Sequence, residues 1–188
     1  MRRRYIPIGF VDPSIIASGS ALILPGATMY HFGILCSAMH NAWMRTVAGR
    51  MKSDFQYSNN IVYNNFPWPS PTAAQRERVE ERAGAIVAAR ARHLPPRGMN
   101  TLADLYDPLT MPAELARAHA ELDRAVDRCY RADAIQSDRE RVEHLFRLYE
   151  QLTRPLLPAP PRWRGRRTRM PVSQRARRSR TPRLPAAQ

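Results

Sequence analysis

Lys52 and Asp54 are the pair of side chains whose types and spacing best suit the reading of a DNA base pair. A lysine ammonium donates to O6 and N7 of guanine, and a carboxylate accepts from the amino group of cytosine. In an extended segment, residues two apart point the same way, so both side chains can reach one base pair. Taken alone, the two residues fit a surface ion pair of little energetic value better.

The segment 57–69, which follows this pair, combines amide and aromatic side chains. Its thirteen residues include four Asn, two Tyr, one Phe and one Trp. Amides bond base edges and aromatic rings stack on bases, so this composition suits nucleic-acid recognition. A strand whose polar residues serve a turn explains the composition equally well.

Further candidates for DNA contacts surround these residues. Arg45 and Arg50, on the predicted helix that leads into the segment, suit phosphate contacts that set the register on DNA. Hydroxyl and amide groups in the segment can bond phosphates or base edges, and these belong to Tyr57, Ser58, Asn59 and Asn60. Ser20, in Ser18-Gly19-Ser20, marks a second candidate reading loop, although ordinary turn chemistry also explains it.

We expect neither a catalytic residue nor a metal site in this sequence. It contains no Asp…Glu-x-Lys nuclease constellation. His31 and His40 lie nine residues apart without a third ligand, which indicates structural histidines. Cys36 and Cys129 are too few for a disulfide scaffold or a zinc site, which fits a reducing cytoplasm.

The net charge of +14 is unevenly distributed. Residues 153–188 hold eleven Arg and no acid, whereas residues 69–152 hold thirteen bases and fourteen acids. The basic tail can bind nucleic acid through counterion release, or it is a solvated appendage. No secretory signal and no apolar run of roughly 18 residues is present, so we expect a cytoplasmic protein without a membrane partner.

The pattern of apolar residues predicts an α+β chain with a change of character near residue 68. Strands are predicted at 5–11, 21–24 and 55–63, with one long helix at 30–50. Helices are predicted at about 72–92, 102–106, 112–130 and 138–152, with Thr72 as an N-cap and Trp68 joining the two parts. We therefore predict a remnant of a larger domain at 1–68, a small helical bundle at 69–152 and a disordered Arg/Pro-rich tail at 153–188.

Residues 2–152 resemble the C-terminal part of MmeI-like proteins, the type IIL restriction–modification enzymes that join an adenine-specific DNA methyltransferase to an endonuclease. The strings that carry the resemblance are Arg-Arg-Arg-Tyr-Ile-Pro-Ile-Gly-Phe, Tyr-His-Phe-Gly-Ile-Leu, Met-His-Asn-Ala-Trp-Met-Arg, Tyr-Ser-Asn-Asn-Ile-Val-Tyr-Asn-Asn-Phe-Pro-Trp-Pro, Leu-Ala-Asp-Leu-Tyr-Asp-Pro-Leu-Thr-Met-Pro and Arg-Val-Glu-His-Leu-Phe-Arg-Leu-Tyr-Glu. The resemblance implies the later part of a target-recognition domain followed by a helical C-terminal domain. It also implies that Lys52 and Asp54 occupy the positions of a charged pair that reads an outer base of the site.

The same resemblance implies what another polypeptide would have to supply. The family uses S-adenosylmethionine and Mg²⁺, and it transfers the methyl group beside an Asn-Pro-Pro-aromatic motif. This sequence contains neither that motif nor the Gly-rich turn that binds S-adenosylmethionine. We therefore expect no cofactor on this chain and no catalysis by it alone, with double-stranded DNA and a separate upstream methyltransferase chain as candidate partners.

The sequence thus predicts a truncated, DNA-reading fragment of a restriction–modification enzyme. Two alternatives stay open from the residues: a helical protein-interaction or structural module, and a basic RNA-associated protein driven by the tail.

Overall fold

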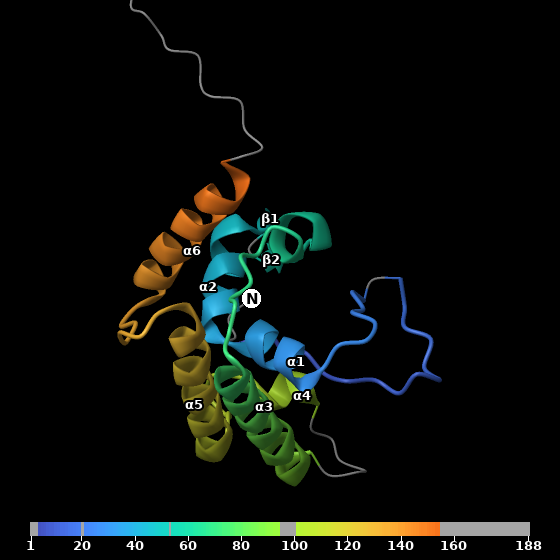
Figure 1. The fold of residues 1–188 in the computed structure, drawn as a ribbon. Helices are drawn as coiled ribbons and strands as arrows, with labels where there is room; N and C mark the ends of the chain where they lie inside the picture. The colour runs from blue at the N-terminus through green and yellow to red at the C-terminus, as the bar shows by residue number, and fades with distance from the viewer. Residues whose placement is uncertain (1–3, 20, 53, 95–100, 155–188) are drawn as a thin grey trace, which may run out of the picture. The chain divides into compact units, whose positions relative to one another are not determined.

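Six α-helices, one π-helix and one short hairpin make up the described part of the chain, residues 4–19, 21–52, 54–94 and 101–154 of a computed structural model (Figure 1). The elements are α1 (Met29–Cys36), α2 (Ala38–Val47), β1 (Gly49–Met51), β2 (Asp54–Gln56), the π-helix η1 (Asn59–Tyr63), α3 (Ala73–His93), α4 (Leu102–Leu105), α5 (Ala113–Tyr130) and α6 (Asp138–Thr153). The predicted α+β class is confirmed. The part of the basic tail that follows Arg154 lies outside the described residues.

The four helices predicted after residue 71 are confirmed, because their signals are local. Thr72 caps α3 by accepting from the backbone N–H of Gln75, whose side chain accepts from the backbone N–H of Thr72 in return. This reciprocal capping box satisfies two N–H groups that a helix start leaves unbonded. Ser137 caps α6 in a similar way through the N–H of Glu140.

The predicted helix 30–50 is wrong in its length. Ser37 takes an extended conformation, with ψ at 161°, and separates α1 from α2. Its hydroxyl donates to the carbonyl of Ile34 and accepts from the N–H of His40, so one side chain ends α1 and caps α2. Such side-chain bonds let Ser compete with the helical backbone. Beyond Val47 the chain turns into β1, so Arg50 belongs to a strand.

The predicted strands are mostly wrong as well. Neither 5–11 nor 21–24 is a strand among the described residues, and the strand predicted at 55–63 covers only 54–56. The first segment is held by side chains of distant helices: Arg90 donates to the carbonyl of Ile8, and Tyr5 donates to Asp123. These side-chain contacts, and not hydrogen bonds to a neighbouring strand, fix the segment. The alternation of apolar residues along it therefore did not indicate a strand.

One apolar core joins the segments that precede and follow residue 70. It contains Trp43 from α2, Val79 from α3, Leu122 from α5 and Leu145 from α6, all almost fully buried. Helices α3 and α5 pack side by side, α1 packs on α3, and α2 packs on α6 (Figure 1). The described residues accordingly fall within one compact unit, Met1–Leu156.

Trp68 packs edge-on against three rings of the front part: His31, Tyr63 and Phe66. The neighbouring Pro67 makes the direct bond to α5, because its carbonyl accepts from the hydroxyl of Tyr130 at 2.9 Å. The link that we predicted at Trp68 is thus shared with the backbone beside it.

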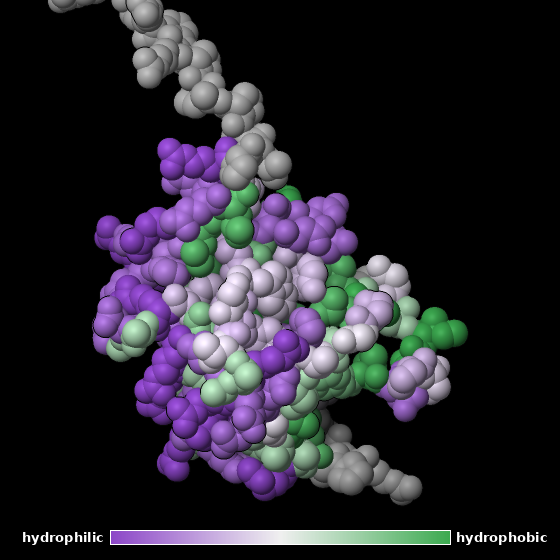
Figure 2. Space-filling model, in the orientation of Figure 1, coloured by the Kyte–Doolittle hydropathy of each residue, from purple (hydrophilic) through white to green (hydrophobic). Residues whose placement is uncertain are grey.

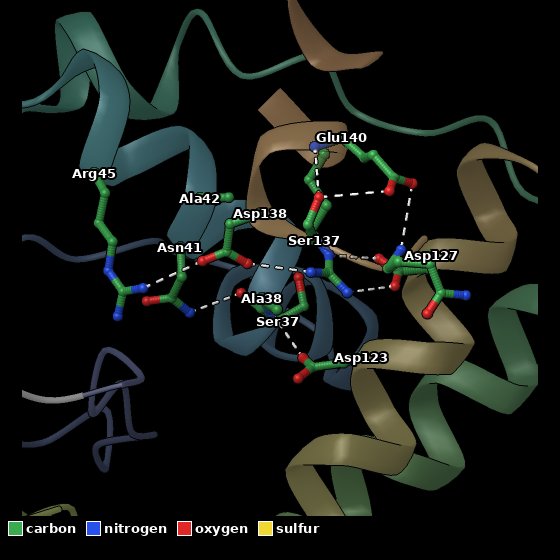
Figure 3. A network of polar contacts seen from close by, with 12 residues as sticks. Ser37, Ala38, Asn41, Ala42, Arg45, Asp123, Asp127, Ser137, Asp138 and Glu140 are labelled. Carbon is green, nitrogen blue, oxygen red and sulfur yellow. Dashed lines mark hydrogen bonds and ion pairs between the residues drawn. The ribbon is translucent and has the colours of Figure 1, made fainter. Parts of the chain in front are cut away.

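A polar network fixes α6 against α2 and α5 (Figure 3). Arg141 grips the carboxylate of Asp127 through two nitrogens, at 3.0 and 2.7 Å. Asp123 accepts from the backbone N–H of Ala38, and burial raises the pKa of this carboxyl to about 6. Within the described residues, no helix is both long and apolar enough to cross a membrane.

Candidate nucleic-acid interface

The hairpin of β1 and β2 follows the C-terminal end of α2 and carries the predicted reading pair at its turn. Met51 pairs with Asp54 in the antiparallel ladder, and Lys52 begins the short connection between the strands. Lys52 has φ at 56°, in the left-handed region. Hairpins of this length favour positive φ in the turn, because such turns match the twist of the strands. Lys52 and Asp54 are both exposed.

The physical argument that we used for this pair needs correction. Lys52 lies in a turn with positive φ, so the two-residue alternation of an extended chain does not apply to it. The ladder pair of Met51 and Asp54 closes the turn, so the backbone at Lys52 lies close in the chain to the start of β2. The base-reading roles themselves stay predictions.

Arg50 lies on the hairpin, and its guanidinium stacks on the ring of Phe55. Its guanidinium lies 4.2 Å from the ring centre of Phe55, its direct cross-strand partner. A guanidinium over an aromatic face is attracted by the ring quadrupole, and the stack also orders a long side chain. Arg50 therefore presents a positive charge from a fixed position on an exposed strand.

Arg45, on α2, bonds to groups of two other segments of the protein. It donates to the backbone carbonyl of Arg4 at 2.7 Å. It also lies 3.5 Å from the carboxylate of Asp138 (Figure 3). These contacts join the N-terminal segment to the start of α6. The phosphate contact that we predicted for Arg45 stays a prediction.

Two of the predicted contact residues turn toward the protein. The hydroxyl of Tyr57 lies 2.9 Å from Nε2 of His40, and burial raises the Tyr57 pKa well above its usual value. Ser58 caps η1 by accepting from the N–H of Ile61. Tyr57 thus ties the segment to α2, and Ser58 fixes the start of η1.

Asn59 and Asn60 are exposed at the first turn of η1. Short π-helical turns are rare and are frequent at functional sites. Asn65 stabilises this turn by donating to the carbonyls of Asn60 and Ile61. Trp43 anchors its far side by donating to the carbonyl of Val62 at 3.0 Å. The result is a supported turn that presents amides to solvent beside the hairpin.

Sequence reasoning missed two exposed apolar side chains on this surface. Met51 and Ile61 are each about half exposed or more, at the hairpin and at η1. The hairpin itself was missed because Lys52-Ser53 lacks the Asn-Gly or Asp-Gly signature of a tight turn. Ser20 lies outside the described residues, as does Ser53.

Among the described residues, no three His, Cys, Asp or Glu side chains lie close enough together to hold a metal ion. His40 illustrates the alternative role: it is buried in α2, and burial lowers its pKa to about 3.

Comparison with known proteins relates both parts of the chain to one protein family. Residues 1–70 match the family described as MmeI, target recognition domain, and residues 71–157 match MmeI, C-terminal domain. DNA methyltransferase A of Bacillus subtilis (strain 168) is 40% identical over 151 residues, which cover 80% of this chain and 17% of that protein.

A solved structure agrees with these matches. It is described as "Structure of Type IIL restriction-modification enzyme MmeI in complex with DNA has implications for engineering of new specificities" and is 44% identical, with a TM-score of 0.75. The match covers 81% of this chain and 20% of that one. This chain thus spans about a fifth of the length of the relatives that it matches. It belongs to the MmeI-like family and carries that family's target recognition and C-terminal domains.

Proposed function

We propose that this chain is a DNA target-recognition module whose hairpin reads one G·C pair. Lys52 donates to guanine and Asp54 accepts from the cytosine amino group. The observation that carries the proposal is the exposed hairpin turn itself, which presents the cationic Lys52 in the connection and the acidic Asp54 at the start of β2. The match of residues 1–70 to a target recognition domain, and the DNA in the complex of the solved relative, support it.

The surroundings of the hairpin divide into groups that touch DNA and groups that position them. Arg50, held over Phe55, contacts a phosphate, while the amides of Asn59 and Asn60 contact phosphate or base edges. Tyr57 and Trp43 fix this surface to α2, and Ser58 caps η1. A supported reading surface is favoured because loosely held side chains lose geometric discrimination.

In this proposal, the chemistry belongs to a separate polypeptide. The family's S-adenosylmethionine and Mg²⁺ bind there, since this sequence lacks the Gly-rich turn and the Asn-Pro-Pro-aromatic motif. The partner carries the methyltransferase, and this chain supplies the contacts that select the site.

Selection from randomised duplex DNA tests the reading role. The full chain is incubated with the library at a fixed salt concentration, and bound duplexes are recovered and sequenced. We expect an enriched site with one strongly preferred G·C pair, and loss of preference at that pair for Lys52→Ala with Asp54→Ala. Arg117→Ala is the control, because Arg117 is exposed on α5. Unchanged enrichment by the double variant would contradict the assignment.

A further inference from the structure

A projecting apolar loop, residues 10–24, is not explained by DNA reading. Its described part exposes six large apolar side chains, each by about half or more: Phe10, Val11, Ile15, Ile16, Leu22 and Ile23. Ile16 is 96% exposed. The loop projects beyond α1 in Figure 1, and Figure 2 shows hydrophobic side chains gathered on it. Large apolar side chains gathered on one exposed segment are typical of an interaction site.

The charge of the apolar loop selects the kind of partner. Asp12 is the one charged residue between Phe10 and Met29, in a chain that is 24% charged. Its carboxylate accepts from the N–H of Ser14 at 2.9 Å, inside the loop. DNA needs cationic side chains, and so does an anionic lipid surface. A surface with six apolar groups and no cation fits the apolar surface of another protein.

The base of the apolar loop is built into the fold. Phe10 stacks on Phe32 of α1, with ring centres 5.2 Å apart. Gly26 has φ at 68° and closes the loop in the Pro25-Gly26 turn before α1 begins. The backbone N–H of Ile15 bonds the carbonyl of Asp12 within the loop. The apolar groups are thus presented from a fixed base.

We propose that the apolar loop is the docking surface for the polypeptide that carries the remaining part of an MmeI-like enzyme. This inference rests on the proposed function and names the place where the catalytic partner binds. Two observations support that occupant: the loop lies inside the segment that matches the target recognition domain, and the matched relatives extend far beyond the match. A surface that is buried against the rest of such a protein becomes exposed when this chain is taken alone.

Co-expression tests the docking surface. This chain is produced together with the Bacillus subtilis DNA methyltransferase A from which the segment similar to this chain has been removed. We expect the two polypeptides to copurify, and sedimentation without DNA to give one copy of each. The variant Ile16→Ser with Ile23→Ser should weaken the complex at least tenfold, because apolar side chains at the centre of an interface carry much of its affinity.

Leu109→Ser is the matched control, because Leu109 is 94% exposed but lies between α4 and α5. It should leave the affinity unchanged. No copurification, or equal affinity of the loop variant and the control, would overturn the proposal. A homodimer of this chain that the loop variant dissociates, with no complex of the two polypeptides, would make a second copy the occupant and would also overturn it.

The DNA selection described above separates this inference from the proposed function. The loop variant should retain the wild-type base preference in DNA selection, whereas Lys52→Ala with Asp54→Ala should retain docking. If the wild-type chain selects a DNA site that depends on Lys52 and Asp54 but does not copurify with the partner, the docking proposal fails alone. If it copurifies through the apolar loop but shows no base preference that depends on Lys52 and Asp54, the reading proposal fails alone.

Discussion

The hydroxyl of Tyr57 lies 2.9 Å from Nε2 of His40, a bond between the segment after β2 and the buried face of α2. We had expected Tyr57 to contact DNA. The bond shows that this residue also supports the segment, together with the Trp43 bond to Val62, and its DNA contact stays a prediction. The segment therefore has two kinds of residue. Asn59 and Asn60 are exposed to solvent, whereas Tyr57 and Val62 bond to α2 and fix the segment to the core.

Tyr57→Phe should lower stability by about 1 kcal/mol, the usual net contribution of a buried hydrogen bond. The preferred DNA sequence should not change, because the ring still fills its place. Urea unfolding and DNA selection measure the two effects. Tyr63→Phe is the control, since the Tyr63 hydroxyl makes no hydrogen bond to another described residue. A changed base preference in Tyr57→Phe would mean that its hydroxyl reads DNA directly.

His40 should make the fold sensitive to acid. Burial lowers its pKa from 6.5 to about 3, so the unfolded chain binds a proton at pH 5 that the folded chain does not. Stability from this residue is therefore complete above about pH 6.5 and is lost as the pH falls toward 3. His40→Gln does not titrate, so its loss of stability between pH 7.5 and 5 should be smaller than that of the wild type by about 2 kcal/mol.

Urea unfolding of both proteins at the two pH values checks this difference. Comparing the wild type with the variant cancels the carboxylates, including Asp123, whose raised pKa acts in the opposite sense. Equal pH dependence of the two proteins would show that His40 is protonated in the folded chain.

Gly33 of α1 lies directly against side chains of α3. A Cβ at this position would lie 2.8 Å from Cγ1 of Val79 and 3.3 Å from Cβ of Ala83. We expect Gly33→Ala to cost about 1–3 kcal/mol through overpacking. Gly84→Ala, in α3 with its nearest neighbour 4.0 Å away, should be neutral or stabilising by up to about 1 kcal/mol. Thermal unfolding of both variants tests the contrast, and equal effects would contradict it.

The helical half of the fold was predictable because its signals lie close together in the sequence. Apolar spacing sets the buried faces of α3, α5 and α6, and capping residues such as Thr72 lie within one turn of the helix that they begin. The front half depends on distant partners. Tyr5 bonds Asp123, 118 residues away, and no local pattern announces that contact.

The candidate site was predictable in composition but not in geometry. Lys52 and Asp54 were identified from their chemistry and from the family resemblance. The left-handed Lys52 and the π-helical turn at Asn59 carry no Gly or Pro that would have signalled them. The π-helical turn is stabilised by contacts to α2, such as the bond from Trp43, and the conformation of Lys52 follows from the closing pair Met51–Asp54.

Removing residues 155–188 should reduce binding to all DNA sequences and leave the preferred site unchanged. The segment contains ten Arg and no acid, and each phosphate that it neutralises adds about 0.9 to the slope of log K against log salt. Fluorescence anisotropy at several salt concentrations measures the slope, and DNA selection measures the preference. Complete loss of nucleic-acid affinity on removal would favour a basic nucleic-acid-binding protein driven by its tail.

Exchanging the charges of the reading pair should reverse the preferred base pair. In Lys52→Glu with Asp54→Arg, the new Arg donates to guanine from one side of the turn, and the new Glu accepts from cytosine at the other. A wrong base pair costs about 1–3 kcal/mol, enough to change which sites are selected. The site profile of the variant, alone and with the co-expressed partner, should therefore show C·G in place of G·C at one position.

Lys52→Gly is the matched control for this exchange. Glycine adopts positive φ at no steric cost, so the hairpin should be as stable as in the wild type or slightly more so. Discrimination at that position should nevertheless weaken, because the ammonium is gone. If the charge exchange lowers binding to every sequence while the preferred base stays the same, Lys52 and Asp54 do not read bases, and the hairpin acts only as a support for its neighbours.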